Sequence, residues 1–252
     1  MADHLVEAQD LRKRFGTSDV LRGVSFTLDK GETLVIMGGS GSGKTVLLRT
    51  IAGLIRPGDG DLRVFGIDIT PLSEEDLLPI RRRLGYVFQG AALFDSLSVY
   101  ENVAFPLREH TSLSEADIRQ RVMHVLSLVG LGEEDVLPKL PSEVSGGMRK
   151  RVGIARALVI EPEMLLFDEP TAGLDPTNSK LVGELILRLK DGVCDTSIVV
   201  THDVELARTV ADRIAILMDG RFEAVGPVGE VMNSSDPAVQ AFLAGEARVV
   251  TA

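Results

Sequence analysis

The chain has 252 residues and a mass of 27.2 kDa, enough for one large domain or two small ones around a hydrophobic core. Hydrophobic residues make up 44% and charged residues 25%, which excludes disorder over most of the chain. The net charge of −10 argues against a nucleic-acid partner, because such a surface repels phosphate backbones. Cys194 is the single cysteine and no apolar stretch could span a bilayer, so we expect a soluble cytoplasmic protein.

Short apolar runs alternate with longer amphipathic stretches along the chain. Two N-terminal segments, 5–14 and 24–29, alternate polar and apolar residues as antiparallel strands do. Buried strands are predicted at 34–37, 84–88, 164–167, 197–200 and 214–218, and helices at 44–54, 115–129, 144–159, 178–190 and 204–209. This alternation predicts an α/β fold with a mostly parallel central sheet.

One long stretch interrupts the alternation of strands and helices. Between about 90 and 159 the pattern is helical, without a convincing strand, and is punctuated by prolines at 106, 138 and 141. We therefore expect a helical subdomain inserted into an α/β core. The expected units are a catalytic core at 1–89 and 160–235, a helical subdomain at 90–159 and a C-terminal tail at 236–252, all within one domain of 1–252. The tail should hold a helical turn around Pro237–Leu243 and then a mobile end.

A glycine-rich loop follows the strand predicted at 34–37 and precedes a predicted helix. It matches the P-loop pattern G-x-x-x-x-G-K-[ST] with the residues Gly38, Gly39, Ser40, Gly41, Ser42, Gly43, Lys44 and Thr45. Glycines let backbone N–H groups wrap around phosphate oxygens, and the helix N-terminus adds its positive end. We expect Lys44 to reach the β- and γ-phosphates and the Thr45 hydroxyl to ligate Mg²⁺. The loop therefore predicts nucleotide binding.

Two acidic residues follow the apolar run at 164–167. A buried strand would place Asp168 at the carboxyl edge of the sheet, beside the phosphate loop, where it would complete the Mg²⁺ shell directly or through water. Glu169 is next and is expected to point elsewhere on the pleat, where it could polarise a water molecule aimed at the γ-phosphate. A solvated Asp-Glu turn is the alternative, and the phosphate loop argues against it. The basic runs at 81–83 and 149–151 are expected to be solvated faces.

The segment Val144-Ser145-Gly146-Gly147-Met148 resembles the signature motif of ABC ATPases, the nucleotide-binding subunits of ATP-binding cassette transporters. Other motifs of that family stand around it in the family's order: Phe15 at the adenine-stacking position, Gln89 at the Q-loop, Ala172-Gly173-Leu174-Asp175 as the D-loop and His202 as the switch histidine. Because Ser145 lies at the start of a predicted helix, it can serve as an N-cap at an anion-binding helix start. The chain is thus identified as a member of this family, which implies a P-loop NTPase fold.

The resemblance implies roles for the matching residues. Phe15, Val20 and Val46 would join the phosphate loop in binding ATP, with Val46 standing where many relatives carry a hydroxyl residue. The implied Mg²⁺ ligands are Thr45, Gln89 and Asp168, and the implied catalytic residues are Glu169, His202 and Gln89. In a head-to-tail homodimer, one copy would act on the ATP of the other through Ser145, Gly146, Gly147 and Met148, with Asp175 in the D-loop.

Departures from the common pattern indicate a branch of the family. They are Met148 in place of the usual glutamine, Ala172-Gly173 in place of Ser-Ala, and the segments 88–110 and 235–245. This set resembles the ATPase subunit of Mla/Mce-type lipid transporters of double-membraned or mycolic-acid bacteria. The resemblance implies phospholipid transport with a multi-helix permease and a periplasmic Mce-type lipid-binding protein, the chain lying on the cytoplasmic face of the inner membrane. The residues expected to face the permease are Leu93, Phe94, Leu97, Val99 and Tyr100.

Three other functions remain open at this point. An ABC importer for amino acids or other small solutes would carry the same core motifs. A soluble ABC protein acting on DNA or ribosomes fits less well, because this chain has one cassette, no sustained heptads and a net charge of −10. A nucleotide-binding regulator without turnover is disfavoured by Glu169, since a degenerate site commonly loses that carboxylate.

Overall fold

The computed structural model describes residues 4–245 and is built around a six-stranded sheet with the order β10-β9-β3-β8-β7-β6. Its parallel strands are β3 (Thr33–Met37), β6 (Leu84–Val87), β7 (Met164–Asp168), β8 (Ser197–Thr201) and β9 (Arg213–Met218). β10 (Arg221–Pro227) pairs antiparallel with β9 at one edge. Both faces of the sheet are covered, which is why each parallel strand is apolar along nearly its whole length. All five parallel strands lie where the sequence predicts them.

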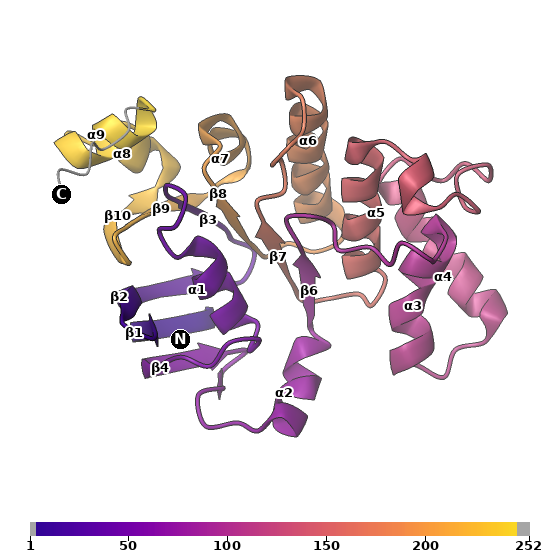
Figure 1. Cartoon of the computed structure of the whole chain (residues 1–252), viewed down its shortest axis with the longest axis horizontal. Coiled ribbons are helices and arrows are strands. Elements are labelled where there is room, and N and C mark those ends of the chain that lie inside the picture. Colours follow the sequence, from indigo (N-terminus) through magenta and orange to yellow (C-terminus); the bar gives the residue numbers. More distant parts are fainter. Residues whose placement is uncertain (1–3, 246–252) are drawn as a thin grey trace.

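A smaller antiparallel sheet has the order β2-β1-β4-β5. Its strands are β1 (His4–Phe15), β2 (Ser18–Asp29), β4 (Asp59–Val64) and β5 (Ile67–Asp68). β1 matches the first predicted strand, and the second, predicted at 24–29, covers only the last half of β2. β4 is rich in Asp and Gly and gives no apolar signal. α1 (Lys44–Ile51) contacts strands of both sheets and buries Leu47, Leu48 and Ile51 between them, so its N-terminus is fixed at the edge of the large sheet (Figure 1).

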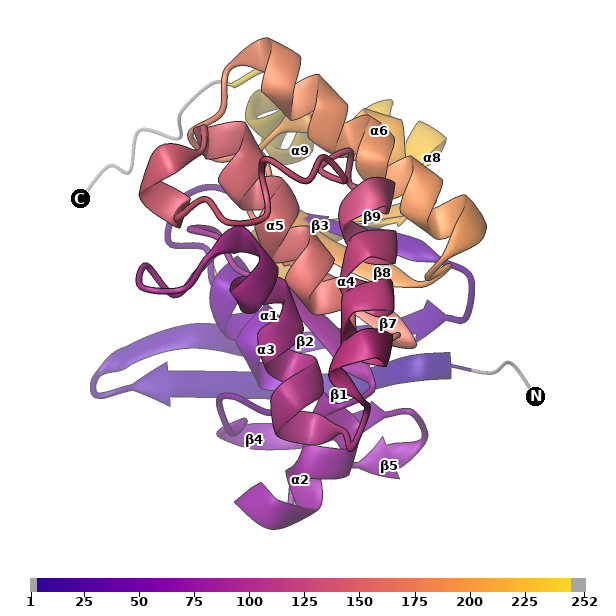
Figure 2. The same cartoon turned by 90° about the vertical axis from the view of Figure 1, so that its right-hand side faces the viewer.

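The stretch after β6 forms the helical part of the molecule. Its helices are α3 (Val99–His110), α4 (Glu115–Leu128), the short 3-10 helix η1 (Pro141–Glu143) and α5 (Gly146–Leu158). They pack on one another at one side of the sheet, which faces the viewer in Figure 2. Between β6 and β7 the described chain contains no strand, as the sequence predicts.

α3 is the helix in this part that the sequence pattern did not predict, because Pro106 lies inside it. The helix forms nevertheless, since Ser98 and Glu101 make a capping box: the Glu101 N–H donates to the Ser98 hydroxyl, and the Ser98 N–H donates to the Glu101 carboxylate at 2.9 Å. Asn102 adds further bonds to the preceding loop. This S-x-x-E signal is visible in the sequence and identifies the start of the helix.

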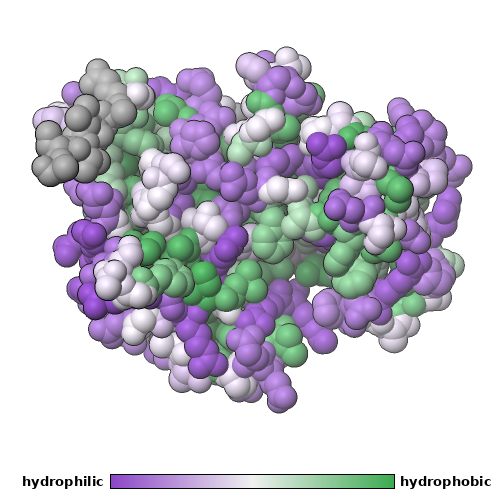
Figure 3. Space-filling view, viewed as in Figure 1, coloured by the Kyte–Doolittle hydropathy of each residue, from purple (hydrophilic) through white to green (hydrophobic). Residues whose placement is uncertain are grey.

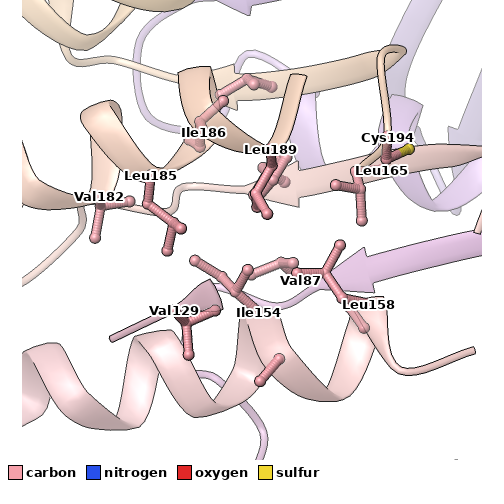
Figure 4. Close-up of a cluster of buried hydrophobic side chains, with 14 of the residues drawn as sticks. Val87, Val129, Ile154, Leu158, Leu165, Val182, Leu185, Ile186, Leu189 and Cys194 are labelled. Atoms are coloured by element: carbon pink, nitrogen blue, oxygen red, sulfur yellow. The ribbon is translucent and has the colours of Figure 1, made fainter. Parts of the chain in front are cut away.

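A second buried cluster joins the sheet to the helices on its other face. α5 and α6 (Pro176–Gly192) both pack on this face, over β6 and β7, and Figure 4 shows Leu185 and Leu189 of α6 opposite Ile154 of α5. The remaining helices are α2 (Glu74–Arg81), α7 (Val204–Val210), α8 (Val228–Met232) and α9 (Pro237–Leu243). α9 is the helical turn expected in the tail, and the expected mobile end falls on residues 246–252, outside the described part. No described helix is both long and apolar enough to cross a membrane.

Candidate nucleotide-binding and catalytic site

The phosphate loop connects β3 to α1 at the carboxyl edge of the parallel sheet. Gly43 is the N-cap of α1 with a φ of 105°, a left-handed conformation that side-chain-bearing residues rarely adopt. A Cβ atom on Gly38 would lie 2.4 Å from the backbone oxygen of Leu217. Both positions therefore require glycine, and the loop is held tightly against β9 and the start of α1.

Lys44 lies inside this loop and is 6% exposed. Its ammonium donates to the backbone oxygens of Gly38 at 2.8 Å and Gly39 at 3.0 Å, so the side chain curls back across the loop. The buried hydroxyl of Ser42 has no hydrogen-bond partner among the described residues. An unpaired buried hydroxyl beside a cation and a helix N-terminus suits a phosphate group, which would accept hydrogen bonds from all three.

Thr45 and Asp168 meet at the same edge, although they are 123 positions apart in the chain. The Thr45 hydroxyl donates to Oδ1 of Asp168 at 2.8 Å, and the Tyr86 hydroxyl donates to Oδ2 at 3.2 Å. A hydroxyl and a carboxylate are hard oxygen ligands of the kind that Mg²⁺ prefers, with phosphate oxygens and water completing its shell. The residues present therefore fit Mg²⁺ held against a bound nucleotide.

The contact of Tyr86, on β6, with Asp168 was not predicted from the sequence. Burial, followed by the charge of Asp168, raises the pKa of its phenol well above the ordinary range. The hydroxyl is therefore a hydrogen-bond donor at physiological pH. A polar tip in a strand that is otherwise Leu, Gly and Val is the only sequence signal of this role.

Glu169 turns towards the phosphate loop, and its direction differs from that of a continued strand. Its φ of 47° ends the pleat of β7 immediately after Asp168, although its N–H still donates to the backbone oxygen of Val200. Its Oε1 lies 3.2 Å from the Lys44 ammonium, and its Oε2 lies 2.9 Å from Nδ1 of His202. A left-handed glutamate costs free energy, of order 1–3 kcal/mol, and such strain occurs at functional sites.

Gln89 follows β6, and its side chain is exposed. Its backbone oxygen accepts a hydrogen bond from the Lys150 ammonium. Within residues 4–245 its side chain forms no hydrogen bond with Thr45 or Asp168, so the structure leaves its proposed contact with Mg²⁺ a prediction.

The predicted adenine-side residues lie at the end of β1 and in β2. The Phe15 ring is 48% exposed, with the Lys13 ammonium 5.2 Å from its centre, so one face is available for stacking. Val20 lies against the phosphate loop, since its Cγ1 would be 3.2 Å from a Cβ on Gly43. Val46, in α1, is half-buried against the core between the two sheets.

The signature and D-loop motifs lie together, at the N-termini of α5 and α6. Ser145 is the N-cap of α5 and accepts from the Met148 N–H at 3.2 Å, as its sequence position predicts. Asp175 caps α6 by accepting from the Asn178 N–H at 3.0 Å. A Cβ on Gly147 would lie 2.6 Å from the Asn178 amide oxygen, so glycine is needed for this close approach. In the described chain neither cap bonds to its own phosphate loop.

The prediction of a solvated basic run at 149–151 is wrong for Lys150. This side chain is 6% exposed and lies on the inner face of α5, where it bonds to backbone oxygens at the sheet edge. Its neighbours Arg149 and Arg151 are less buried. Arg151 donates to the backbone oxygens of Val129 and Gly130 at the end of α4, and Arg149 donates to that of Val144.

A groove of about 640 Å³ lies between α2, β6 and α3. Leu78, Phe94 and Phe105 border it and are 49%, 44% and 37% exposed. Hydrophobic surface lines a hollow at this place in Figure 3. Of the residues expected at an exposed interface, Phe94 is exposed and Leu93, Leu97 and Tyr100 are half-buried. Val99 is fully buried at the start of α3, so that expectation is wrong for Val99.

Comparisons with known proteins agree with this geometry. The family model described as "ABC transporter" matches residues 21–172. The chain is 43% identical over 240 residues to the "Probable ribonucleotide transport ATP-binding protein mkl" of Mycobacterium tuberculosis, covering 95% of this chain and 66% of that protein, so it spans slightly less than two thirds of that relative. It is 41% identical to the "Intermembrane phospholipid transport system ATP-binding protein MlaF" of Haemophilus influenzae, over 98% of this chain and 92% of that one.

A solved structure is also similar. It is a dimeric ATP-binding cassette in a post-hydrolysis state, bound to ADP and Pi, with a TM-score of 0.81 and 34% identity over 88% of this chain and 98% of the other. At 88% of the chain, the likeness extends over most of the fold. The chain therefore belongs to the ABC transporter family and has the fold of an ATP-binding cassette.

Proposed function

We propose that ATP hydrolysis by this chain powers the movement of phospholipids, or of related lipids, through a membrane permease. The observation that carries the ATPase part is the contact of Glu169 with both Lys44 and His202, beside the Thr45–Asp168 pair. The lipid part is supported by the similarity to MlaF, which covers nearly the full length of both chains. In this proposal the chain lies on the cytoplasmic face of the inner membrane and works with an Mce-type lipid-binding protein.

The contacts suggest a role for each group in hydrolysis. The phosphate-loop N–H groups and Lys44 hold the β- and γ-phosphates, and the exposed ring of Phe15 stacks on the adenine, with Val20 beside the loop. Thr45 and Asp168, with Gln89, would hold Mg²⁺, which would neutralise negative charge on the phosphates when bound. The Glu169 carboxylate accepts a proton from the attacking water, and His202 holds this carboxylate by its Nδ1 contact.

A second copy of the chain would complete the site. Ser145 and the N-terminus of α5 form an anion-binding helix start, with Gly146 exposed and Met148 in the first turn, but in this chain they have no bond to the phosphate loop. We propose that they bind the γ-phosphate held by a second copy, with Asp175 and the start of α6 at the same interface. The dimeric state of the similar solved cassette supports this arrangement.

The first experiment tests the role of Glu169. Glu169→Gln keeps the size of the side chain but removes its basicity, so turnover should fall by about a hundredfold or more while ATP binding is retained. Steady-state hydrolysis and nucleotide binding would be measured side by side. Glu163→Gln is the matched control, because Glu163 is an exposed partner of Arg83 and should leave turnover unchanged. Hydrolysis near the wild-type rate in Glu169→Gln would contradict the assignment.

The second experiment tests the transported substrate. The chain would be purified from its native membranes, and the co-purifying proteins and bound lipids identified by mass spectrometry. We expect an integral membrane protein, an Mce-type protein and phospholipid. A permease that co-purifies with a periplasmic solute-binding protein and no lipid would favour the second candidate, a small-solute importer. The name of the mkl relative, a probable ribonucleotide transport protein, also supports that candidate.

A further inference from the structure

Lys150 is a buried lysine to which the proposed reaction gives no role. It lies in the second turn of α5, five residues after the signature serine, and is 6% exposed. Its ammonium donates to the backbone oxygen of Gln89 and, at 3.2 Å, to that of Glu169. One side chain of the signature helix therefore bonds to the two segments that carry the proposed Mg²⁺ and catalytic side chains.

Both acceptors lie just beyond the ends of neighbouring strands. β6 ends at Val87 and β7 at Asp168, so the backbone oxygens of Gln89 and Glu169 lie beyond the ladder that pairs these strands. A buried backbone oxygen without a donor is destabilising, and Glu169 is only 7% exposed. The Lys150 ammonium supplies a donor to both, at the point where Glu169 adopts its left-handed φ of 47°.

Simple packing does not account for a lysine at this position. A cation near the N-terminus of a helix is disfavoured by the helix dipole, and a buried ammonium must be compensated by acceptors or by opposite charge. Burial lowers the pKa of Lys150, whereas the carboxylates of Glu169 and Asp168 act in the opposite direction. The stabilising partners of Lys150 are thus groups of the site itself.

We propose that Lys150 is a positioning residue for ATP hydrolysis, which fixes Glu169 and the Q-loop relative to the signature helix. If a second copy closed on the N-terminus of α5 and displaced this helix, the segments after β6 and β7 would therefore move together with it. The inference rests on the roles proposed for Glu169 and Gln89.

Substitutions of two neighbouring cations on α5 test the proposal. Lys150→Met keeps the length and apolar bulk of the side chain but removes the donors. Arg151→Met is the matched control, because Arg151 also donates to two backbone oxygens, at 3.1 and 3.0 Å, but these belong to Val129 and Gly130 at the end of α4. Melting temperature, kcat and KM for Mg-ATP would be measured for both variants, well below their melting temperatures.

We expect Lys150→Met to lower kcat by about tenfold or more with KM changed less than about threefold, as for loss of a positioning contact. Arg151→Met should lower the melting temperature but retain wild-type kcat. Lys150→Arg, which keeps the charge and the donors, should recover a large part of kcat. If Lys150→Met does not fold, Lys150→Gln takes its place under the same criterion.

Three outcomes would overturn the inference. They are a wild-type kcat in Lys150→Met, an equal loss of kcat in Arg151→Met, and no recovery in Lys150→Arg although that variant folds. Measuring Glu169→Gln in the same assay distinguishes failure of the Lys150 inference from failure of the proposed function. If Glu169→Gln loses turnover and Lys150→Met does not, only the role of Lys150 is wrong, whereas an active Glu169→Gln removes the proposed roles on which the inference rests.

Discussion

Asp168 illustrates how a single side chain is oriented for metal binding. Its two carboxylate oxygens accept hydrogen bonds from different elements, one from Thr45 at the start of α1 and one from Tyr86 on β6. A carboxylate held on both sides keeps one rotamer, which lowers the cost of ordering it when Mg²⁺ binds. The Tyr86 contact also joins the Mg²⁺ site to the strand that leads into the Q-loop.

Removal of the Tyr86 hydroxyl should therefore weaken Mg²⁺ binding. In Tyr86→Phe the ring remains packed beside Phe88, so the fold should be retained, but Asp168 loses a donor. We expect the Mg²⁺ concentration needed for half-maximal hydrolysis to rise by about tenfold, the usual scale for loss of a contact to a metal ligand. Titration of hydrolysis with Mg²⁺ measures this directly.

Tyr100→Phe is the control, since Tyr86 and Tyr100 are the two tyrosines of the chain. The Tyr100 ring lies 6.0 Å from the Arg108 guanidinium, in the helical part and outside the Mg²⁺ site. It should leave the Mg²⁺ titration unchanged. Equal titrations in the two variants would show that the Tyr86 hydroxyl does not help to hold Asp168 for the metal.

At the scale of elements, the loop between β6 and α3 is shaped by contacts from helices. Ala91 and Ala92 have φ values of 61° and 49°, and the Arg156 guanidinium of α5 donates to both backbone oxygens at 2.8 Å. Asn102, fully buried in α3, accepts from the Phe94 N–H and donates to the Leu97 backbone oxygen. Hydrogen bonds from α5 and α3 hold this strained turn in place, so Phe94 stays at the surface in a fixed position and not in a flexible loop.

Phe94 is consequently predicted to act in partner binding and not in stability. Its ring is 44% exposed and lies 4.8 Å from the Phe105 ring, across the mouth of the groove. Phe94→Asp should leave the melting temperature within a few degrees of wild type, because an aspartate there is solvated and can pair with Arg156. Co-purification with the membrane subunits, and stimulation of hydrolysis by them, should be lost.

Val225→Asp serves as the control for this change. Val225 is 41% exposed on the edge strand β10, away from the groove, so a charge there should affect neither stability nor co-purification. A large fall in the melting temperature of Phe94→Asp alone would mean that Phe94 belongs to the core.

At the scale of the whole molecule, the phosphate loop and the signature start belong to different parts of the fold. The phosphate loop begins α1, between the two sheets, whereas Ser145 begins α5 in the helical part. The dimeric proposal predicts that defects in these two places complement each other. Lys44→Ala damages the phosphate loop, and Ser145→Arg blocks the helix start.

Each variant alone should be inactive, because both sites of its homodimer carry the defect. A heterodimer of the two variants places both defects on one composite site and leaves the opposite site intact, so hydrolysis should reappear. Differently tagged copies would be co-expressed, the heterodimer isolated by tandem affinity, and ATP hydrolysis measured. The absence of hydrolysis in a verified heterodimer would contradict shared sites.

The sequence by itself determined the parts of the protein whose cause is local. The phosphate loop follows from glycines and a lysine at fixed spacing, and the buried strands follow from short apolar runs with Asp168 at the end of one of them. Helix starts such as Ser145 and Asp175 follow from side chains that cap their own backbone. These features need only neighbours within a few residues, so a one-dimensional pattern contains them.

Only the tertiary structure decided where side chains from distant segments meet. The burial of Lys150 depends on which face of α5 lies against the sheet edge, and the contact of Tyr86 with Asp168 depends on the pairing of β6 with β7. Glu169 reaches Lys44 because its backbone leaves the pleat, which alternation along the strand does not predict. Each of these contacts joins residues brought together by packing, and no local spacing in the chain specifies them.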